Sequence, residues 1–141
     1  MQARIKWVEE RTFVGQSGSG HTVVLDASVE NGGRNLGASP MELVLIGTGG
    51  CTAFDVVDIL KKGRHAVTDC WVELEAERAE QVPRVFTSIT MRFVVTGHNL
   101  ARAAVERAVQ LSADKYCSAS IMLGKSVRFE HRIEVREAEA A

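Results

Sequence analysis

Apolar and polar side chains alternate near the start of the chain, in the middle and at the end, and this period of two predicts strands. Residues 2–8 place Ala3, Ile5 and Trp7 on one face. Residues 21–26 are expected to form a second strand after a Ser-Gly-Ser-Gly turn, so the chain is expected to begin as a hairpin or meander. Further strands are expected over 70–76, 89–95 and 127–135.

A long apolar segment between the strands carries the signals of a helix. Ser39 suits the N-cap, Pro40 suits the first helical position, and Glu42 stands where it closes a capping box. The helix is expected to reach about Lys62, with Gly63 as its stop.

Residues 99–112 carry an apolar stripe at helical spacing, followed by a break near 112–114 and a shorter helix at about 115–123. Strands grouped around one long helix predict an α+β fold and not a parallel dinucleotide-binding sheet. The length of 141 residues fits one domain, residues 1–141.

Composition excludes several classes of protein. A net charge of −1 gives no electrostatic footprint for nucleic acid. The N-terminus lacks the apolar core of a signal peptide, and three cysteines without a framework spacing favour a reducing, cytoplasmic location. The apolar stretch 41–60 contains Glu42, Asp55 and Asp58, so we expect a buried helix and no membrane span.

Two cysteines carry the candidate chemistry. Cys51 lies within the long helix, and Cys117 follows 66 positions later; neither has the CxxC or CxxH spacing of a metal site. Such a pair suggests one thiol that reacts and another that resolves it, and the two Cα atoms should then lie within about 7 Å or come there by a small helix movement. The alternative is that both are small side chains in a core.

Glycines surround the first of these cysteines. Gly47, Gly50, Cys51 and Phe54 share one helical face, and each interior glycine costs roughly 1 kcal/mol relative to alanine. Close approach of another helix on this face accounts for the glycines. Since the helix is apolar all round, a dimer covers it more easily than one chain.

The residues Ser39-Pro40-Met41-Glu42-Leu43, Gly49-Gly50-Cys51 and Lys115-Tyr116-Cys117-Ser118 together resemble the OsmC/Ohr family, the osmotically inducible and organic hydroperoxide resistance proteins. The resemblance covers nearly the whole chain and is closest to the YhfA-like branch. It implies an intertwined homodimer in which antiparallel sheets wrap around long central helices.

The resemblance also implies an activity without metal or cofactor. Cys51 attacks an organic hydroperoxide and becomes a sulfenic acid, Cys117 condenses with it to a disulfide, and a dithiol reductant resets the pair. Family peroxidases place an arginine and a glutamate beside the reactive thiol. Glu42 is the candidate glutamate, and Arg11 and Arg34 lie in the corresponding region for the arginine.

Helix geometry bears on these roles. Glu42 and Cys51 are nine residues apart, about 13 Å along the axis and on opposite faces, so Glu42 can reach only a partner's Cys51, and a purely capping role also accounts for it. Asp55 and Asp58 share the face of Cys51, and an unpaired carboxylate raises the pKa of a nearby thiol. A cation from Lys61, Lys62 or Arg64 could pair with Asp58.

Other functions therefore stay open beside the peroxidase. One is a non-catalytic dimer of the same fold that binds a small apolar ligand. Another is a redox sensor or structural dimer whose thiols form a regulatory disulfide. Cys117 near a helix start is expected to have a lowered pKa.

Overall fold

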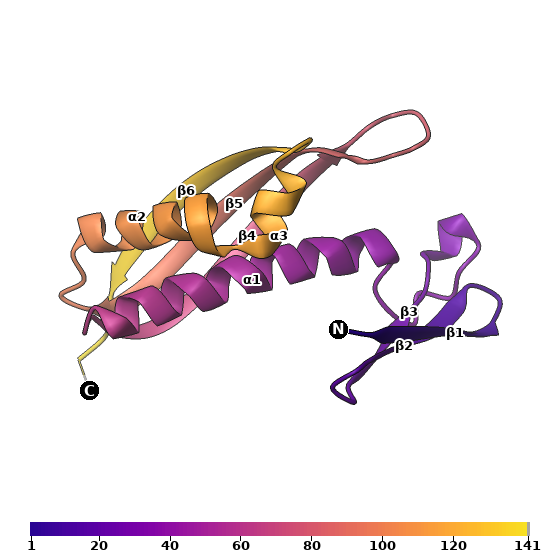
Figure 1. Ribbon diagram of the computed structural model, residues 1–141, viewed down its shortest axis with the longest axis horizontal. Coiled ribbons are helices and arrows are strands. Elements are labelled where there is room, and N and C mark those ends of the chain that lie inside the picture. The colour runs from indigo at the N-terminus through magenta and orange to yellow at the C-terminus, as the bar shows by residue number, and fades with distance from the viewer. Residues whose placement is uncertain (141) are drawn as a thin grey trace. The chain divides into compact units, whose positions relative to one another are not determined.

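The computed structural model describes residues 1–140 and has the α+β fold expected from the sequence (Figure 1). The described chain separates into two compact units, Met1–Val44 and the residues from Leu45 onward. The helices and strands are β1 (Ala3–Glu9), β2 (Thr12–Ser17), β3 (Thr22–Leu25), η1 (Val29–Asn31), α1 (Pro40–Lys62), β4 (Ala66–Arg78), β5 (Phe86–His98), α2 (Arg102–Leu111), η2 (Ser112–Tyr116), α3 (Ser118–Leu123) and β6 (Arg128–Glu137). That the chain forms one domain stays a prediction.

The first unit is an antiparallel meander in the order β1-β2-β3. Its register places Trp7 beside Phe13, and Ile5 and Val23 on either side of Gly15, all on one face. The large side chains of this face remain exposed, with Trp7 at 60 % and Ile5 at 59 %. The meander alone therefore leaves an apolar sheet face uncovered.

A buried carboxylate ties down the loop that follows β3. Asp26 is 2 % exposed and accepts hydrogen bonds from the Thr12 hydroxyl at 3.0 Å and from the backbone N–H groups of Ala27, Arg34 and Leu36. Burial by itself raises the pKa of Asp26, but these four hydrogen bonds outweigh burial and lower it. Segment 27–36 is thus held by one side chain.

The second unit contains a sheet in the order β4-β5-β6, with α1, α2 and α3 on one of its faces (Figure 1). The central strand β5 forms the core, and its Ile89, Met91, Phe93 and Val95 are completely buried. Strands β4 and β5 are antiparallel, as expected, whereas β6 runs parallel to β5. The parallel pair arises because the chain returns through two helices, a connection that parallel strands require.

Helix α1 begins with the expected capping box. The Glu42 N–H donates to the Ser39 hydroxyl at 3.3 Å, and the Ser39 N–H donates to Glu42 Oε2 at 2.7 Å. The helix ends at Lys62, as predicted, but the left-handed residue after it is Arg64, at φ 60°, and not Gly63.

By length and composition alone, α1 is the one helix of residues 1–140 that could cross a membrane, with a mean hydropathy of 1.7 over 18 residues. Core helices pass the same test, so this is weak evidence. Only 28 % of that window is buried within the chain, so most of α1 has surface left to cover.

The break expected near 112–114 is wrong. Helix α2 continues directly into the π-helical turn η2, and helix α3 starts only at Ser118, three residues later than the predicted 115. The polar run Ser112-Ala113-Asp114 suggested an end to the helix. The chain continues because the Ser112 side chain has buried partners on α1.

Candidate functional site

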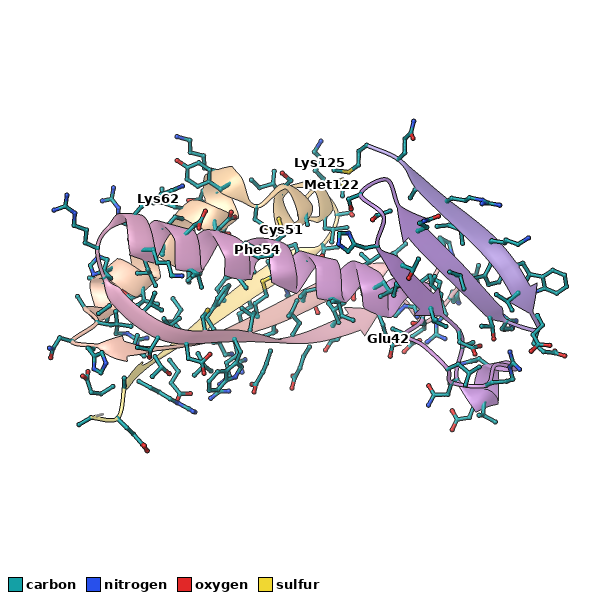
Figure 2. All side chains as sticks on the ribbon, turned by 90° about the horizontal axis from the view of Figure 1, so that it is seen from below. Glu42, Cys51, Phe54, Lys62, Met122 and Lys125 are labelled. Atoms are coloured by element: carbon teal, nitrogen blue, oxygen red, sulfur yellow. The ribbon has the colours of Figure 1, made fainter. Side chains whose placement is uncertain are left out.

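The two candidate thiols lie on different elements of the second unit and come together there. Cys51 is half-buried midway along α1, as Figure 2 shows, with Phe54 one turn further on. Cys117 is completely buried at the N-cap of α3, where its sulfur accepts a hydrogen bond from the Ser120 N–H at 3.4 Å. The Cys117 side chain lies within hydrogen-bonding reach of the Cys51 side chain, and all three cysteines are free thiols.

The pKa of Cys117 is raised, contrary to the expectation for a helix start. Burial is the largest cause, and the neighbouring Cys51 adds to it, while the hydrogen bonds from Ser120 act in the opposite direction without outweighing burial. Cys117 is therefore a protonated thiol at neutral pH. A buried protonated thiol is a poor nucleophile toward a molecule in solution.

The carboxylates beside Cys51 have partners of their own. Asp55 accepts a hydrogen bond from the Ser112 hydroxyl at 2.8 Å. Asp58 lies 3.8 Å from the Lys62 ammonium, one of the cations the sequence offered, although both side chains are well exposed. Such an exposed pair contributes little to stability.

The glycines of α1 differ from the expectation of one closely packed face. Gly49 is the glycine that packs tightly, because a Cβ there would stand 2.6 Å from Leu74 Cδ1 of β4. At Gly47 and Gly50 an added Cβ would meet no atom of residues 1–140 within 4 Å, and Phe54 on the same face is 80 % exposed. The face of α1 that carries Gly47, Gly50 and Phe54 is therefore open in the single chain.

The charged residues named for the site lie elsewhere in the chain. Glu42 stands at the start of α1 (Figure 2), where the capping box engages its carboxylate. Arg34 donates to Glu9 at 2.8 Å and to the Thr12 hydroxyl at 2.9 Å. Arg11 is exposed, and no ion pair or hydrogen bond engages its side chain in the part of the chain that the structure describes. The catalytic roles of Cys51, Cys117 and Glu42 stay predictions.

Sequence reasoning missed the polar groups that surround the thiol pair. Ser112, Thr52 and Ser120 are all buried and bonded next to Cys51 or Cys117. Thr52 and Ser120 stand one and three residues from a thiol, a spacing that could have drawn notice. For Ser112, the π turn that brings it into contact has no signature in the sequence.

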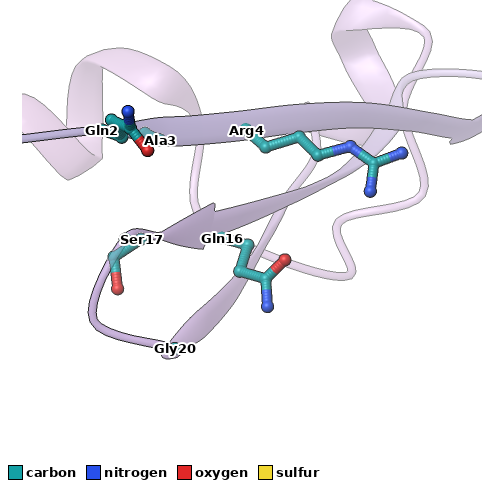
Figure 3. Close-up of a pocket in the computed structure, with 7 residues that line it drawn as sticks. Gln2, Ala3, Arg4, Gln16, Ser17 and Gly20 are labelled. Atoms are coloured by element: carbon teal, nitrogen blue, oxygen red, sulfur yellow. The ribbon is translucent and has the colours of Figure 1, made fainter.

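Two of the hollows in the first unit differ in their lining. A polar one of about 320 Å³ contains no cysteine, histidine or carboxylate (Figure 3) and is lined by Gln2, Ala3, Arg4, Gln16, Ser17, Gly18 and Gly20. A more apolar one of about 510 Å³ lies against the uncovered sheet face and is lined by Ile5, Glu10, Arg11, Phe13, Leu25, Asp26, Ala27 and Pro40. Among residues 1–140, no three His, Cys, Asp or Glu side chains gather as metal ligands would.

The OsmC-like protein family model matches residues 32–132, which include both thiols and most of the second unit. This chain belongs to the OsmC-like family. It is 55 % identical to the protein YhfA of Escherichia coli strain K12 over 135 residues, which cover 96 % of this chain and 98 % of that one.

Solved structures show the OsmC-like fold over almost the whole chain. A hypothetical protein from Aquifex aeolicus VF5 superposes with a TM-score of 0.86 at 31 % identity, covering 98 % of this chain and 97 % of that one. An organic hydroperoxide resistance protein OsmC from Legionella pneumophila superposes with a TM-score of 0.71 at 15 % identity, covering 94 % and 95 %. At that identity the second likeness concerns the fold alone.

Proposed function

We propose that this protein reduces organic hydroperoxides with Cys51 as the reacting thiol and Cys117 as the resolving thiol. The observation that carries the proposal is the meeting of these side chains, 66 positions apart in sequence, as two free thiols in one buried region. Membership of the OsmC/Ohr family supports a redox function. The remaining support comes from the difference in burial between the two thiols.

The difference in exposure supports an order in which the two thiols react. Cys51 is half-buried, so part of its side chain is open to a solute. Cys117 is completely buried and keeps its proton, so its accessible partner is Cys51. Cys51 therefore meets the hydroperoxide, and Cys117 acts second.

The steps balance without a metal. The Cys51 thiolate attacks the terminal oxygen of ROOH, the O–O bond breaks, and the alkoxide leaves and takes a proton to give ROH. Cys117 then attacks the sulfur of the Cys51 sulfenic acid, an S–S bond forms, and water leaves with the Cys117 proton. A dithiol reductant restores both thiols by exchange and becomes a disulfide itself.

The surface beside Cys51 suits an organic substrate. Phe54, one turn after Cys51 on α1, is 80 % exposed, and Met122 of α3, the helix that Cys117 caps, is 65 % exposed. Burying the alkyl part of a hydroperoxide on such side chains is favourable by about 25 cal/mol per Å². Hydrogen peroxide has no apolar part, so it gains nothing there.

We also propose that the functional form is a homodimer. Proteins of the OsmC/Ohr family are generally dimeric. Two apolar surfaces of this chain need cover: the sheet face with Ile5 and Trp7, and the α1 face with Ile46, Gly47 and Gly50. Contiguous exposed apolar surface of this kind marks protein interfaces. A second copy covers α1 without inserting it into a membrane.

Competition kinetics test the peroxidase directly. The protein is mixed with cumene hydroperoxide or hydrogen peroxide, and free thiols are counted against time. We expect loss of two thiols per chain, faster with the organic peroxide and abolished in Cys51→Ser. Equal rates with the two peroxides contradict the apolar subsite, and no thiol loss contradicts the activity.

The hollow of about 510 Å³ favours a second candidate, a non-catalytic dimer that binds a small apolar ligand. Its largely apolar lining suits a small apolar ligand. Binding of an uncharged fluorescent apolar dye that Phe13→Arg abolishes, in a protein that consumes no hydroperoxide, is the result expected for this second function.

A further inference from the structure

Ser112 is a buried residue whose hydroxyl takes part in two hydrogen bonds. Its side chain is completely buried, and its hydroxyl donates to Asp55 Oδ2 at 2.8 Å. The same oxygen lies 2.9 Å from the Thr52 hydroxyl. Because a serine hydroxyl has one proton and that proton is on the carboxylate bond, Thr52 is the donor to Ser112. The order of donation is therefore Thr52 to Ser112 to Asp55.

The backbone of Ser112 engages the other thiol segment. The Cys117 N–H donates to the Ser112 carbonyl at 2.8 Å and closes the π turn η2. Thr52 follows Cys51 directly, and Asp55 stands one helical turn after it. One residue thus joins the turn of α1 that carries Cys51 to the N-cap that carries Cys117.

The π turn itself has a consequence for Cys117. A π turn closes at i+5 where an α-helix closes at i+4, so it inserts one residue before the cysteine. Such turns are frequent at functional sites. Without the side-chain bonds of Ser112 to α1, the segment has less to hold it in this uncommon form, and the Cys117 sulfur is free to rotate away from Cys51.

We propose, resting on the thiol chemistry proposed above, that Ser112 is a positioning residue that fixes Cys117 against Cys51 for formation of the disulfide. In that step the Cys117 sulfur bonds to the Cys51 sulfur, the S–O bond of the sulfenic acid breaks, and water leaves. Ser112 touches neither the peroxide nor the reacting atoms. It acts by keeping the second sulfur in place.

The equilibrium between the Cys51–Cys117 dithiol and its disulfide tests this role without any peroxide. The full-length protein is equilibrated with reduced and oxidised dithiothreitol, and the disulfide fraction is measured by mass spectrometry. In Ser112→Ala we expect the equilibrium constant for disulfide formation to fall roughly tenfold to a hundredfold, as for a misplacement of about 1 Å. An unchanged constant overturns the proposal.

Graded variants separate positioning from general loss of structure. Thr52→Val keeps the bond from Ser112 to Asp55, so the constant should fall about fivefold, the effect of one hydrogen bond. Asp55→Asn keeps an oxygen acceptor for Ser112 and should stay near wild type, whereas Asp55→Ala should resemble Ser112→Ala. The control Ser88→Ala removes a hydroxyl of β5 bonded to Glu77 and should change nothing.

If Ser112→Ala does not fold, the pair Asp55→Asn and Asp55→Ala decides, and equal constants for these two overturn the proposal. A kinetic readout adds a second criterion. With cumene hydroperoxide, Ser112→Ala should form the Cys51 sulfenic acid at the wild-type rate and accumulate it, as trapping with dimedone will show. A parallel slowing of both steps points to a merely structural role and overturns the proposal.

The two proposals fail in different ways. A wild-type protein that consumes no hydroperoxide, but whose disulfide equilibrium still falls in Ser112→Ala, overturns the peroxidase and keeps the positioning role. A wild-type protein that turns over hydroperoxide, with Ser112→Ala unchanged in both readouts, keeps the peroxidase and overturns the positioning role.

Discussion

The segment around Cys51 and the segment around Cys117 differ in how far they are open to solvent. Cys51 is half-buried on a helix with two open glycines and an exposed phenylalanine beside it. Cys117 is completely buried, with its backbone and sulfur both hydrogen-bonded. In the proposed reaction, this difference in access decides which of two identical side chains meets the substrate.

The largest expected effect distinguishes the two thiols. Cys51→Ser should abolish hydroperoxide consumption, because the accessible sulfur is gone. Cys117→Ser should still react once per chain and accumulate a sulfenic acid, since only the resolving step is lost. Single-turnover kinetics with dimedone trapping measure both. Equal loss in the two variants contradicts the division of roles.

A smaller effect is expected from the arginine that the family resemblance implies beside the reactive thiol. An opposite charge nearby lowers a pKa by one to three units, so losing it reduces the thiolate at neutral pH about tenfold or more. Arg34 is already engaged by Glu9 and Thr12, and the side chain of Arg11 is not engaged in the described chain.

We therefore expect Arg11→Ala to slow Cys51 oxidation about tenfold. Arg34→Ala is the matched control and should change the rate less. The check is the rate of thiol loss at pH 7. A greater effect of Arg34→Ala reverses the assignment.

The open face of α1 gives a third test. Gly50→Leu places a large side chain where the single chain has room but the proposed partner helix does not. Overpacking costs about 1–3 kcal/mol, so association should weaken roughly tenfold. Analytical ultracentrifugation measures this, with the exposed Lys61→Leu as control. Unchanged association of Gly50→Leu would place the interface elsewhere.

The smallest effect on thiol chemistry is expected from Asp26, which lies in the first unit. Its folded pKa is lowered, so its stabilisation is complete above the unfolded value of about 3.9 and is lost as pH falls through the lower folded pKa. The Tm of the wild-type protein, measured by thermal melts, should therefore fall as the pH is lowered below about 4.

In Asp26→Asn that acid-dependent loss should be absent and the neutral-pH Tm should be lower, because the amide serves the four donors less well. The rate of Cys51 oxidation at pH 7 should be unchanged. A variant with wild-type Tm at pH 7 contradicts the role of Asp26 in holding segment 27–36.

Much of this architecture follows from local pattern. The capping box at Ser39 and the alternation in β5 placed a helix and a core strand where the structure has them, because caps and burial act over a few residues. The parallel pairing of β6 and the π turn at Ser112 escaped prediction, since both depend on long-range contacts. The same holds for the raised pKa of Cys117, because burial at a helix start is decided by the whole fold.

The site was predictable in its cysteines and not in its surroundings. Their type and the family resemblance singled out Cys51 and Cys117, and the fold brings them together. Glu42 illustrates the opposite case, because one carboxylate fits both a catalytic motif and a helix cap, and the structure shows it in the cap. The tightly packed glycine could be identified only from the neighbouring strand, since Leu74 of β4 lies against Gly49, whereas no side chain of the described residues lies against Gly50.

Peptide mapping after one equivalent of cumene hydroperoxide is the most direct test of the central claim. The wild-type protein is oxidised, alkylated without reductant, digested and analysed by mass spectrometry. The account predicts one disulfide that joins the peptides of Cys51 and Cys117, with Cys70 alkylated as a free thiol. Recovery of both Cys51 and Cys117 as alkylated thiols, or a disulfide that includes Cys70, would contradict it.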